Sequence, residues 1–206
     1  MEKQSTNQNL SNNSVSVFEK NLAEFTGAPY AIATDCCTHA LELCLRLLKP
    51  KEVTTSCYTY LSVPMTLKKL DIKINWSDEM WIGEYQLQGT RVWDSARLLH
   101  PMMYRKGQLQ CLSFGHGKPL DAKRGGAILC DSKEDYKVLK EMSHDGRDLT
   151  FNNWVDQKEF NIGFHYNMPF EHAEKCNILL EQYKQLEGHL PKIIKYPDCR
   201  TISIKG

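Results

Sequence analysis

The chain has 206 residues, of which 41% are hydrophobic and 25% charged, which is enough for one sizeable hydrophobic core. Its 26 basic and 25 acidic residues are mixed along the sequence, so the net charge of +1 points to no nucleic-acid or membrane partner. Every apolar run is shorter than the roughly 20 residues that span a bilayer, and the start lacks the apolar stretch of a signal peptide. We therefore expect a cytoplasmic protein.

The first predicted element is a helix that follows a polar arm. Residues 1–14 are rich in Asn, Gln and Ser and offer little to bury, which predicts a flexible or partner-ordered N-terminal arm. From Val15 the apolar residues recur at helical spacing until Gly27, which predicts an amphipathic helix. The apolar run AIATD (31–35) then predicts a strand that leads directly into a helix over CCTHALELCLRLL.

Strands and helices alternate through the following part of the chain. Their composition and spacing predict strands at 52–58, 71–75, 90–94, 108–114 and 125–131, with helices at 64–70, 133–143 and about 169–188. This alternation predicts an α/β fold with three layers, α/β/α, around a mostly parallel sheet. The main domain is expected to span 15–190, and the short tail, 191–206, could add one or two strands.

Eight cysteines are scattered along the chain, mostly inside apolar segments. We expect them to be reduced, buried thiols. The sequence has no CxxC motif and no His/Cys cluster with zinc spacing, so we expect no structural metal.

Lys118 is the principal catalytic candidate. It follows a strand-like run in SFGHGKPL, and small neighbours leave its amine approachable, although a single lysine is a weak signal. Asp94 ends the apolar strand in VWDSA, where a carboxylate needs a charged or hydrogen-bonding partner. Thr38 begins a helix directly after a strand, where free amides and the helix dipole favour a phosphate. Ser113 offers a second hydroxyl close to the lysine.

Simpler interpretations remain open for several of these residues. Tyr58 and Tyr60 can be core aromatics, and Thr38 can be an ordinary helix N-cap. The pair at 125–126 can be only a turn, and His116 can be an exposed loop histidine.

The order of five short motifs resembles the DegT-type sugar aminotransferases, a pyridoxal-phosphate-dependent family with the aspartate-aminotransferase-like fold, fold type I. The motifs are CCTHAL (36–41), YTYLSV (58–63), WDSA (93–96), SFGHGK (113–118) and GGAILC (125–130), and the resemblance runs from about Val15 to Gln185. It implies the large, cofactor-binding domain of that fold, with the C-terminal small domain largely missing and only the tail as its remnant.

The resemblance also implies a role for each matching residue. Lys118 would hold pyridoxal 5'-phosphate as a Schiff base and move a proton between the substrate carbon and C4′ of the cofactor. Asp94 would keep the ring nitrogen protonated. The other implied cofactor contacts are Thr38, Ser113 and the amides around Cys37 at the phosphate, Tyr60 on the ring face, and Arg97, which stands where a Gln or His meets the phenolic oxygen.

The segment 160–174, FNIGFHYNMPFEHAE, is similar to a family segment that reaches the active site of the neighbouring subunit. By position, His165 and Asn167 would contact cofactor or substrate across a homodimer interface, although both identities differ from the family's. Cys37 replaces the glycine of the phosphate-binding turn. The chain between Trp76 and Arg91 is short, so we expect that one strand and one helix are missing there.

The implied reaction transfers an amino group, from glutamate, to a keto sugar that is linked to a nucleotide. Two alternatives stay open. One is a pyridoxal-phosphate-dependent sugar dehydratase, although such family members replace the lysine by histidine. The other is a catalytically degenerate protein that uses the fold as a binding scaffold, which the short chain and the changed residues favour.

Overall fold

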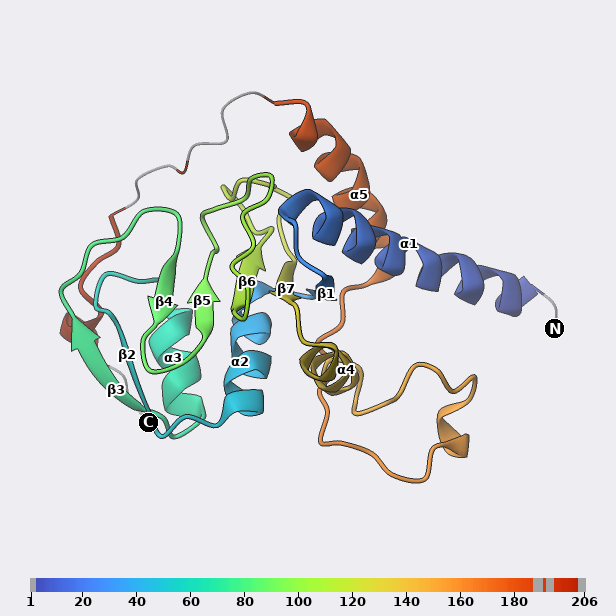
Figure 1. The fold of residues 1–206 in the computed structure, drawn as a ribbon, viewed down its shortest axis with the longest axis horizontal. Coiled ribbons are helices and arrows are strands. Elements are labelled where there is room, and N and C mark those ends of the chain that lie inside the picture. The colour runs from blue at the N-terminus through green and yellow to red at the C-terminus, as the bar shows by residue number, and fades with distance from the viewer. Residues whose placement is uncertain (1–2, 187–190, 192–194, 204–206) are drawn as a thin grey trace.

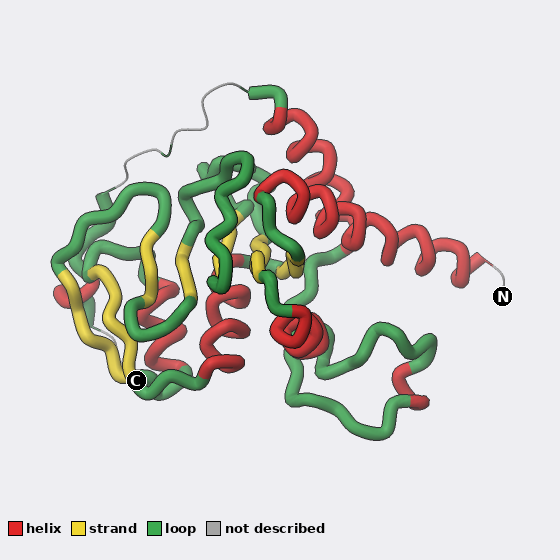
Figure 2. Tube along the Cα trace, viewed as in Figure 1, coloured by secondary structure: helices red, strands yellow, loops and turns green. Residues whose placement is uncertain are grey.

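The computed structural model describes residues 3–186, 191 and 195–203, with side chains from Ser14 onward. Figures 1 and 2 show a central sheet with helices on both of its faces. The strands are β1 (Tyr30–Thr34), β2 (Glu52–Ser56), β3 (Lys73–Ser77), β4 (Tyr85–Leu87), β5 (Val92–Asp94), β6 (Leu109–Ser113) and β7 (Gly126–Cys130). Five of them form a sheet in the order β1-β7-β6-β5-β4, and β2 pairs with β3.

The helices divide between the two faces. α1 (Lys3–Thr26) and α5 (Phe170–Lys184) pack on one face, and α2 (Cys37–Leu48), α3 (Ser62–Lys69) and α4 (Lys133–Met142) cover the other (Figure 1). Alternate residues of β7 supply the two cores, since Ile128 packs with α2 while Ala127 and Leu129 pack with α1 and α5. The predicted α/β class and its three layers are confirmed.

The sheet is mixed, so the prediction of a mostly parallel sheet was wrong. β5 pairs with β6 in parallel, and β2 with β3, but β7 runs antiparallel to both β1 and β6, and β4 antiparallel to β5. The connections explain this only in part. The short connection from β4 to β5 suits an antiparallel pair, because parallel neighbours need a long crossover. The chain passes without a helix both from β5 to β6, which are parallel, and from β6 to β7, which are antiparallel.

Three boundaries differ from the sequence predictions. α1 begins at Lys3 and not near Val15, because the polar arm contains neither Gly nor Pro to stop a helix. β4 lies in the stretch that was expected to lack a strand. In the tail, residues 195–203 carry a 3₁₀ turn, Cys199–Thr201, and no strand, while 192–194 and 204–206 lie outside the described residues.

The glycine pair before β7 does more than form a turn. Gly125 has φ of +103°, and a Cβ on Gly126 would collide with the backbone of Cys36 and Cys37. The start of β7 therefore lies directly against the start of α2. This close approach fixes the helix N-terminus beside the ends of β5 and β6.

All eight cysteines are free thiols, seven of them buried and Cys36 half-buried, as the sequence predicted. Within the described residues, no helix combines the length and apolar character that crossing a membrane requires.

Candidate active site

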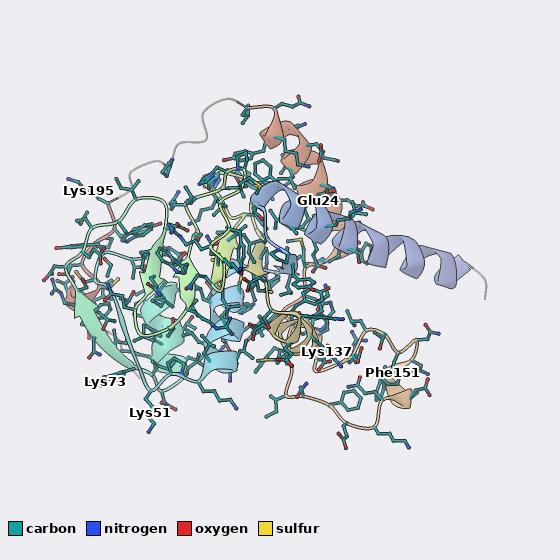
Figure 3. The ribbon with its side chains drawn as sticks, in the orientation of Figure 1. Glu24, Lys51, Lys73, Lys137, Phe151 and Lys195 are labelled. Atoms are coloured by element: carbon teal, nitrogen blue, oxygen red, sulfur yellow. The ribbon has the colours of Figure 1, made fainter. Side chains whose placement is uncertain are left out.

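A cavity of about 370 Å³ opens where β5, β6 and the N-terminus of α2 meet. It brings together most of the residues that the sequence singled out, although they are far apart in the chain. Lysines labelled in Figure 3, such as Lys51 and Lys73, lie at the periphery of the molecule, whereas Lys118 is half-buried in this cavity. The predicted site residues in its wall are Cys37, Thr38, Tyr60, Asp94, Arg97, Ser113 and Lys118.

Asp94 is a carboxylate at the end of β5 with only 4% of its surface exposed. The Ala96 amide donates to Oδ1 at 3.0 Å, and the Tyr85 hydroxyl donates to Oδ2 at 3.2 Å. Burial raises the pKa of Asp94, while the Ala96 amide and the charge of Lys118 oppose this shift. The hydrogen-bonding partners that such a buried carboxylate was expected to need are therefore present.

Tyr85 is a neighbour of Asp94 that the sequence analysis missed. Its hydroxyl lies 2.5 Å from the Thr59 hydroxyl, and burial raises the pKa of Tyr85 well above its ordinary value. The phenol therefore remains protonated and able to donate. No sequence pattern pointed to Tyr85, because it belongs to β4, between Trp76 and Arg91, where the sequence analysis expected a strand to be missing.

Lys118 lies in the loop after β6, where its amide donates to the Gly115 carbonyl. Burial lowers the pKa of Lys118, the nearby Arg97 charge lowers it further, and Asp94 acts in the opposite direction. A lysine with a lowered pKa has more neutral amine near pH 7, which is the form that attacks a carbonyl carbon.

The N-terminus of α2 faces the same cavity. Its N-cap residue, Cys36, is extended and makes no side-chain cap hydrogen bond, so no N-cap side chain occupies the first-turn amides. Cys37 and Thr38 line the cavity within this turn, and burial raises the pKa of the Cys37 thiol. Thr38 is therefore not the N-cap. An uncapped helix N-terminus suits an anion such as a phosphate.

The cavity mouth is aromatic. Tyr60 is 60% exposed there, which rules out the interpretation of this residue as a core aromatic. Trp81 and Tyr196 also line the cavity, with their rings nearly parallel at 17° and 5.9 Å between centroids. Neither was predicted, because an aromatic residue in an isolated polar segment carries no sequence signal. His116 lies at the rim as an exposed loop histidine, beside Asp121 and Lys123.

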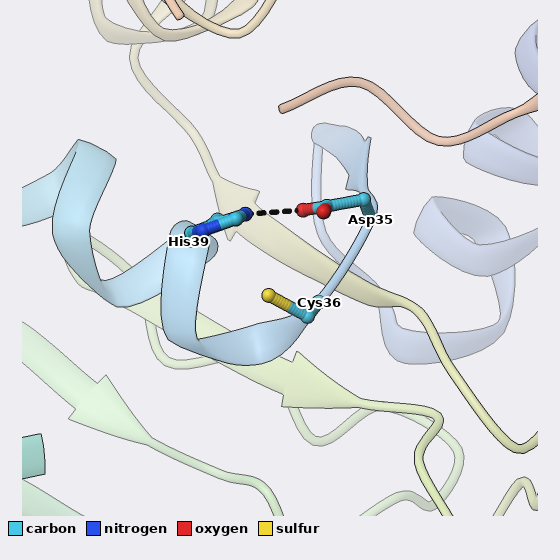
Figure 4. A group of neighbouring side chains, drawn as sticks. All are labelled: Asp35, Cys36 and His39. Carbon is cyan, nitrogen blue, oxygen red and sulfur yellow. Dashed lines mark hydrogen bonds and ion pairs between the residues drawn. The ribbon is translucent and has the colours of Figure 1, made fainter. Parts of the chain in front are cut away.

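Three potential metal donors also meet beside this helix N-terminus, as Figure 4 shows. Donor atoms of Asp35, Cys36 and His39 lie within 4.8 Å of one another, a grouping that cysteine and histidine spacing did not predict. Both oxygens of Asp35 already have partners, since His39 Nδ1 lies 2.6 Å from Oδ1 and Arg124 donates to Oδ2 at 2.8 Å. The hydrogen bonds to Asp35 and then to Cys36 raise the pKa of His39 to about 9. The cations His39 and Arg124 thus share the single Asp35 carboxylate, and this network carries more positive than negative charge.

Two predicted residues lie outside the cavity lining. His165 is exposed and pairs with Asp145 at 3.0 Å. Asn167 pairs with Thr34 through its backbone, and its side-chain oxygen is buried without a hydrogen-bond partner within the described part of the chain.

Comparison with known proteins supports the resemblance found in the sequence. Residues 2–76 match the sequence model of the DegT/DnrJ/EryC1/StrS aminotransferase family. No curated protein matches the chain.

Solved structures with the same fold include sugar aminotransferases. A 3-amino-5-hydroxybenzoic acid (AHBA) synthase gives a TM-score of 0.69 at 19% identity, over 84% of this chain and 56% of that one. The sugar aminotransferase CalS13 from Micromonospora echinospora gives 0.68 at 16% identity, over 84% and 61%. The PLP-form of a putative sugar aminotransferase, Spr1654, from Streptococcus pneumoniae gives 0.64 at 18% identity, over 84% and 60%. The predicted fold is confirmed, and the chain spans about three fifths of the length of these proteins.

Proposed function

We propose that this chain is a pyridoxal-phosphate-dependent aminotransferase of the sugar-modifying type. The observation that carries the proposal is one cavity that holds a half-buried lysine, a buried carboxylate and an uncapped helix N-terminus. These three groups match the aldehyde, the ring nitrogen and the phosphate of the cofactor. The family match at residues 2–76 supports the same assignment.

Some of these residues would hold the cofactor, and Lys118 would also move a proton. Pyridoxal phosphate supplies an electron-accepting ring when it is bound. Lys118 would hold the cofactor through its aldehyde, and its amine, once free, would carry the proton to and from the substrate carbon. Asp94 would keep the ring nitrogen protonated. Thr38, Ser113 and the amides at Cys37 would hold the phosphate and Tyr60 would cover the ring, while Arg97 lines the same cavity.

For the substrates, we propose glutamate as amino donor and a keto sugar, linked to a nucleotide, as acceptor. The similarity to solved sugar aminotransferases supports the sugar. The exposed aromatic mouth supports a ring-shaped ligand, since apolar faces of a sugar pack well on aromatic rings.

We also propose a cytoplasmic homodimer. Free, mostly buried thiols suit a reducing compartment. Residues 149–162 form a loop that projects from the body after α4, with Phe151 labelled in Figure 3. It exposes a group of large hydrophobic side chains that a second subunit can cover: Leu149, Phe151, Trp154, Val155, Phe160 and Ile162. In such a dimer we place the exposed His165, together with Asn167, at the partner's cofactor or substrate, as the resemblance implies.

The spectrum of the purified chain tests the proposal. Added pyridoxal phosphate is expected to give a visible or near-ultraviolet band, and borohydride should then attach the cofactor to Lys118, as identified by mass spectrometry. Lys118→Ala should abolish this adduct, whereas Lys123→Ala, which removes an exposed lysine at the cavity rim, should keep it.

Two results would contradict transamination in different ways. A chain that stays colourless with the cofactor would favour the degenerate scaffold. A coloured chain whose spectrum glutamate does not change would favour a dehydratase, which analysis of the product from a keto sugar would then identify.

A further inference from the structure

Arg97 is a cavity cation whose hydrogen-bond partners are all neutral. Its Nη1 donates to the Gly117 carbonyl at 2.8 Å, and Nε and Nη2 both donate to the Tyr196 hydroxyl at 3.2 Å. Within the described residues, no carboxylate forms an ion pair with Arg97 or with Arg147, whose Nε donates to the His144 carbonyl, whereas each of the other arginines has such a partner: Arg46, Arg91, Arg105, Arg124 and Arg200.

The direction of these bonds matters. Nε and Nη2 form the edge of the guanidinium that binds a carboxylate through two parallel hydrogen bonds. Here both donors converge on a single neutral oxygen. A carboxylate would give each donor its own charged acceptor, and such charge-assisted bonds are about twice as strong as neutral ones.

Described residues on both sides of Tyr196 contact the body of the protein. Pro191 lies close to Gly83 and Leu98, and the Cys199 amide donates to the Cys57 carbonyl at 2.8 Å. The Cys199 thiol also lies 3.3 Å from the Thr59 carbonyl oxygen. Between these contacts the Tyr196 ring stacks on Trp81 and forms one wall of the cavity that contains Lys118.

We propose that Arg97 binds a carboxylate of the amino donor, and that Tyr196 is the neutral partner which it releases when the donor arrives. This inference rests on the proposed function and moves Arg97 from the cofactor's phenolic oxygen to the substrate. Lys118 and Arg97 line one cavity and influence each other electrostatically, so a donor held by Arg97 through a carboxylate has its amine within the same space.

Binding of unreactive acids tests this subsite apart from activity. Glutarate has two carboxylates and no amine, and glutaramide is its neutral counterpart. Calorimetry and the fluorescence of the chain, which includes Trp81 stacked on Tyr196, should both report binding of glutarate and not of glutaramide. Arg97→Gln should weaken glutarate binding by about ten-fold or more, since a hydrogen bond to a charged group contributes about 1.5–3 kcal/mol. Arg97→Lys should retain only part of the glutarate affinity, because an ammonium lacks the two parallel donors of a guanidinium.

The affinity for pyridoxal phosphate, measured in the same variants, separates this inference from the proposed function. We expect Arg97→Gln to change it by less than about three-fold, because the phosphate and ring contacts remain. Arg105→Gln, which removes a cation paired with Glu84 outside the cavity, should leave both affinities unchanged. Equal glutarate affinity in wild type and Arg97→Gln would overturn the subsite, even in a chain that binds the cofactor. Failure of the cofactor to bind, with Arg97-dependent glutarate binding intact, would overturn only the proposed function.

Discussion

The pKa of Lys118 responds to one cation and one anion in its cavity, and these can be removed separately. Arg97 lowers this pKa and Asp94 raises it, on top of the lowering by burial. Arg97→Gln is therefore expected to raise the pKa of Lys118, and Asp94→Asn to lower it. Competitive acetylation of the cofactor-free chain at a series of pH values, with the Lys118 peptide followed by mass spectrometry, measures both shifts. Movement of both variants in the same direction would show that the two charges do not act on this amine as the structure indicates.

The candidate site shows which single residues a sequence can reveal. Lys118 and Asp94 could be singled out because Asp94 ends a strand and Lys118 lies in the loop after one, each within a motif of fixed order, and the structure places both in one cavity. Tyr85 and Tyr196 were not, because they reach the site by tertiary packing, from β4 and from the C-terminal segment. The role that we propose for Arg97 rests on the direction of its donors, which no spacing in the sequence encodes.

At the scale of elements, the first turn of α2 is tied to the end of β1 by the ion pair between His39 and Asp35, with the imidazole stacked on Tyr166. The pKa of His39 is raised to about 9, above the value of about 6.5 expected in the unfolded chain. The contribution of this pair to stability is thus complete below about pH 6.5 and is lost as the pH rises through about 9.

Unfolding by urea at pH 6.5 and pH 9.5 checks this pH dependence. His39→Gln is expected to lower the free energy of unfolding by about 1 kcal/mol at the lower pH, the size typical of a partly exposed pair. At the higher pH the variant and the wild type should differ much less. His100→Gln, in which the lost contact is only to the Pro101 carbonyl, serves as the matched control. An equal loss at both pH values would mean that the charge of His39 contributes nothing.

The elements themselves were predictable where local pattern decides them. The apolar runs that became β1, β6 and β7 and the periodic helices α2 and α4 appear close to their predicted positions. Strand direction was not predictable from these patterns, because β5–β6 and β6–β7 are both joined without a helix, yet the first pair is parallel and the second antiparallel. The extension of α1 to Lys3 was missed for another reason, since polar residues without Gly or Pro neither demand nor forbid a helix.

At the scale of the whole molecule, the loop 149–162 should decide the oligomeric state. It exposes Trp154 to 58% and Ile162 to 83%, a concentration of apolar surface that a monomer rarely leaves open. We expect the wild type to sediment as a dimer at micromolar concentration. Replacing Phe151 and Trp154 together by Asp should weaken association by about 700-fold or more, because buried aromatic anchors typically contribute about 2 kcal/mol or more each.

Sedimentation of a matched variant tests whether dimerisation depends on this loop or on any exposed apolar residue. Ile178 is 62% exposed on α5, so Ile178→Asp should leave the dimer intact. If His165 of one subunit reaches the cavity of the other, the monomeric double variant should also bind pyridoxal phosphate more weakly, although every residue that lines its own cavity is unchanged. Tight cofactor binding by a monomer would show that one chain encloses its site alone, and that the exposed loop serves another contact.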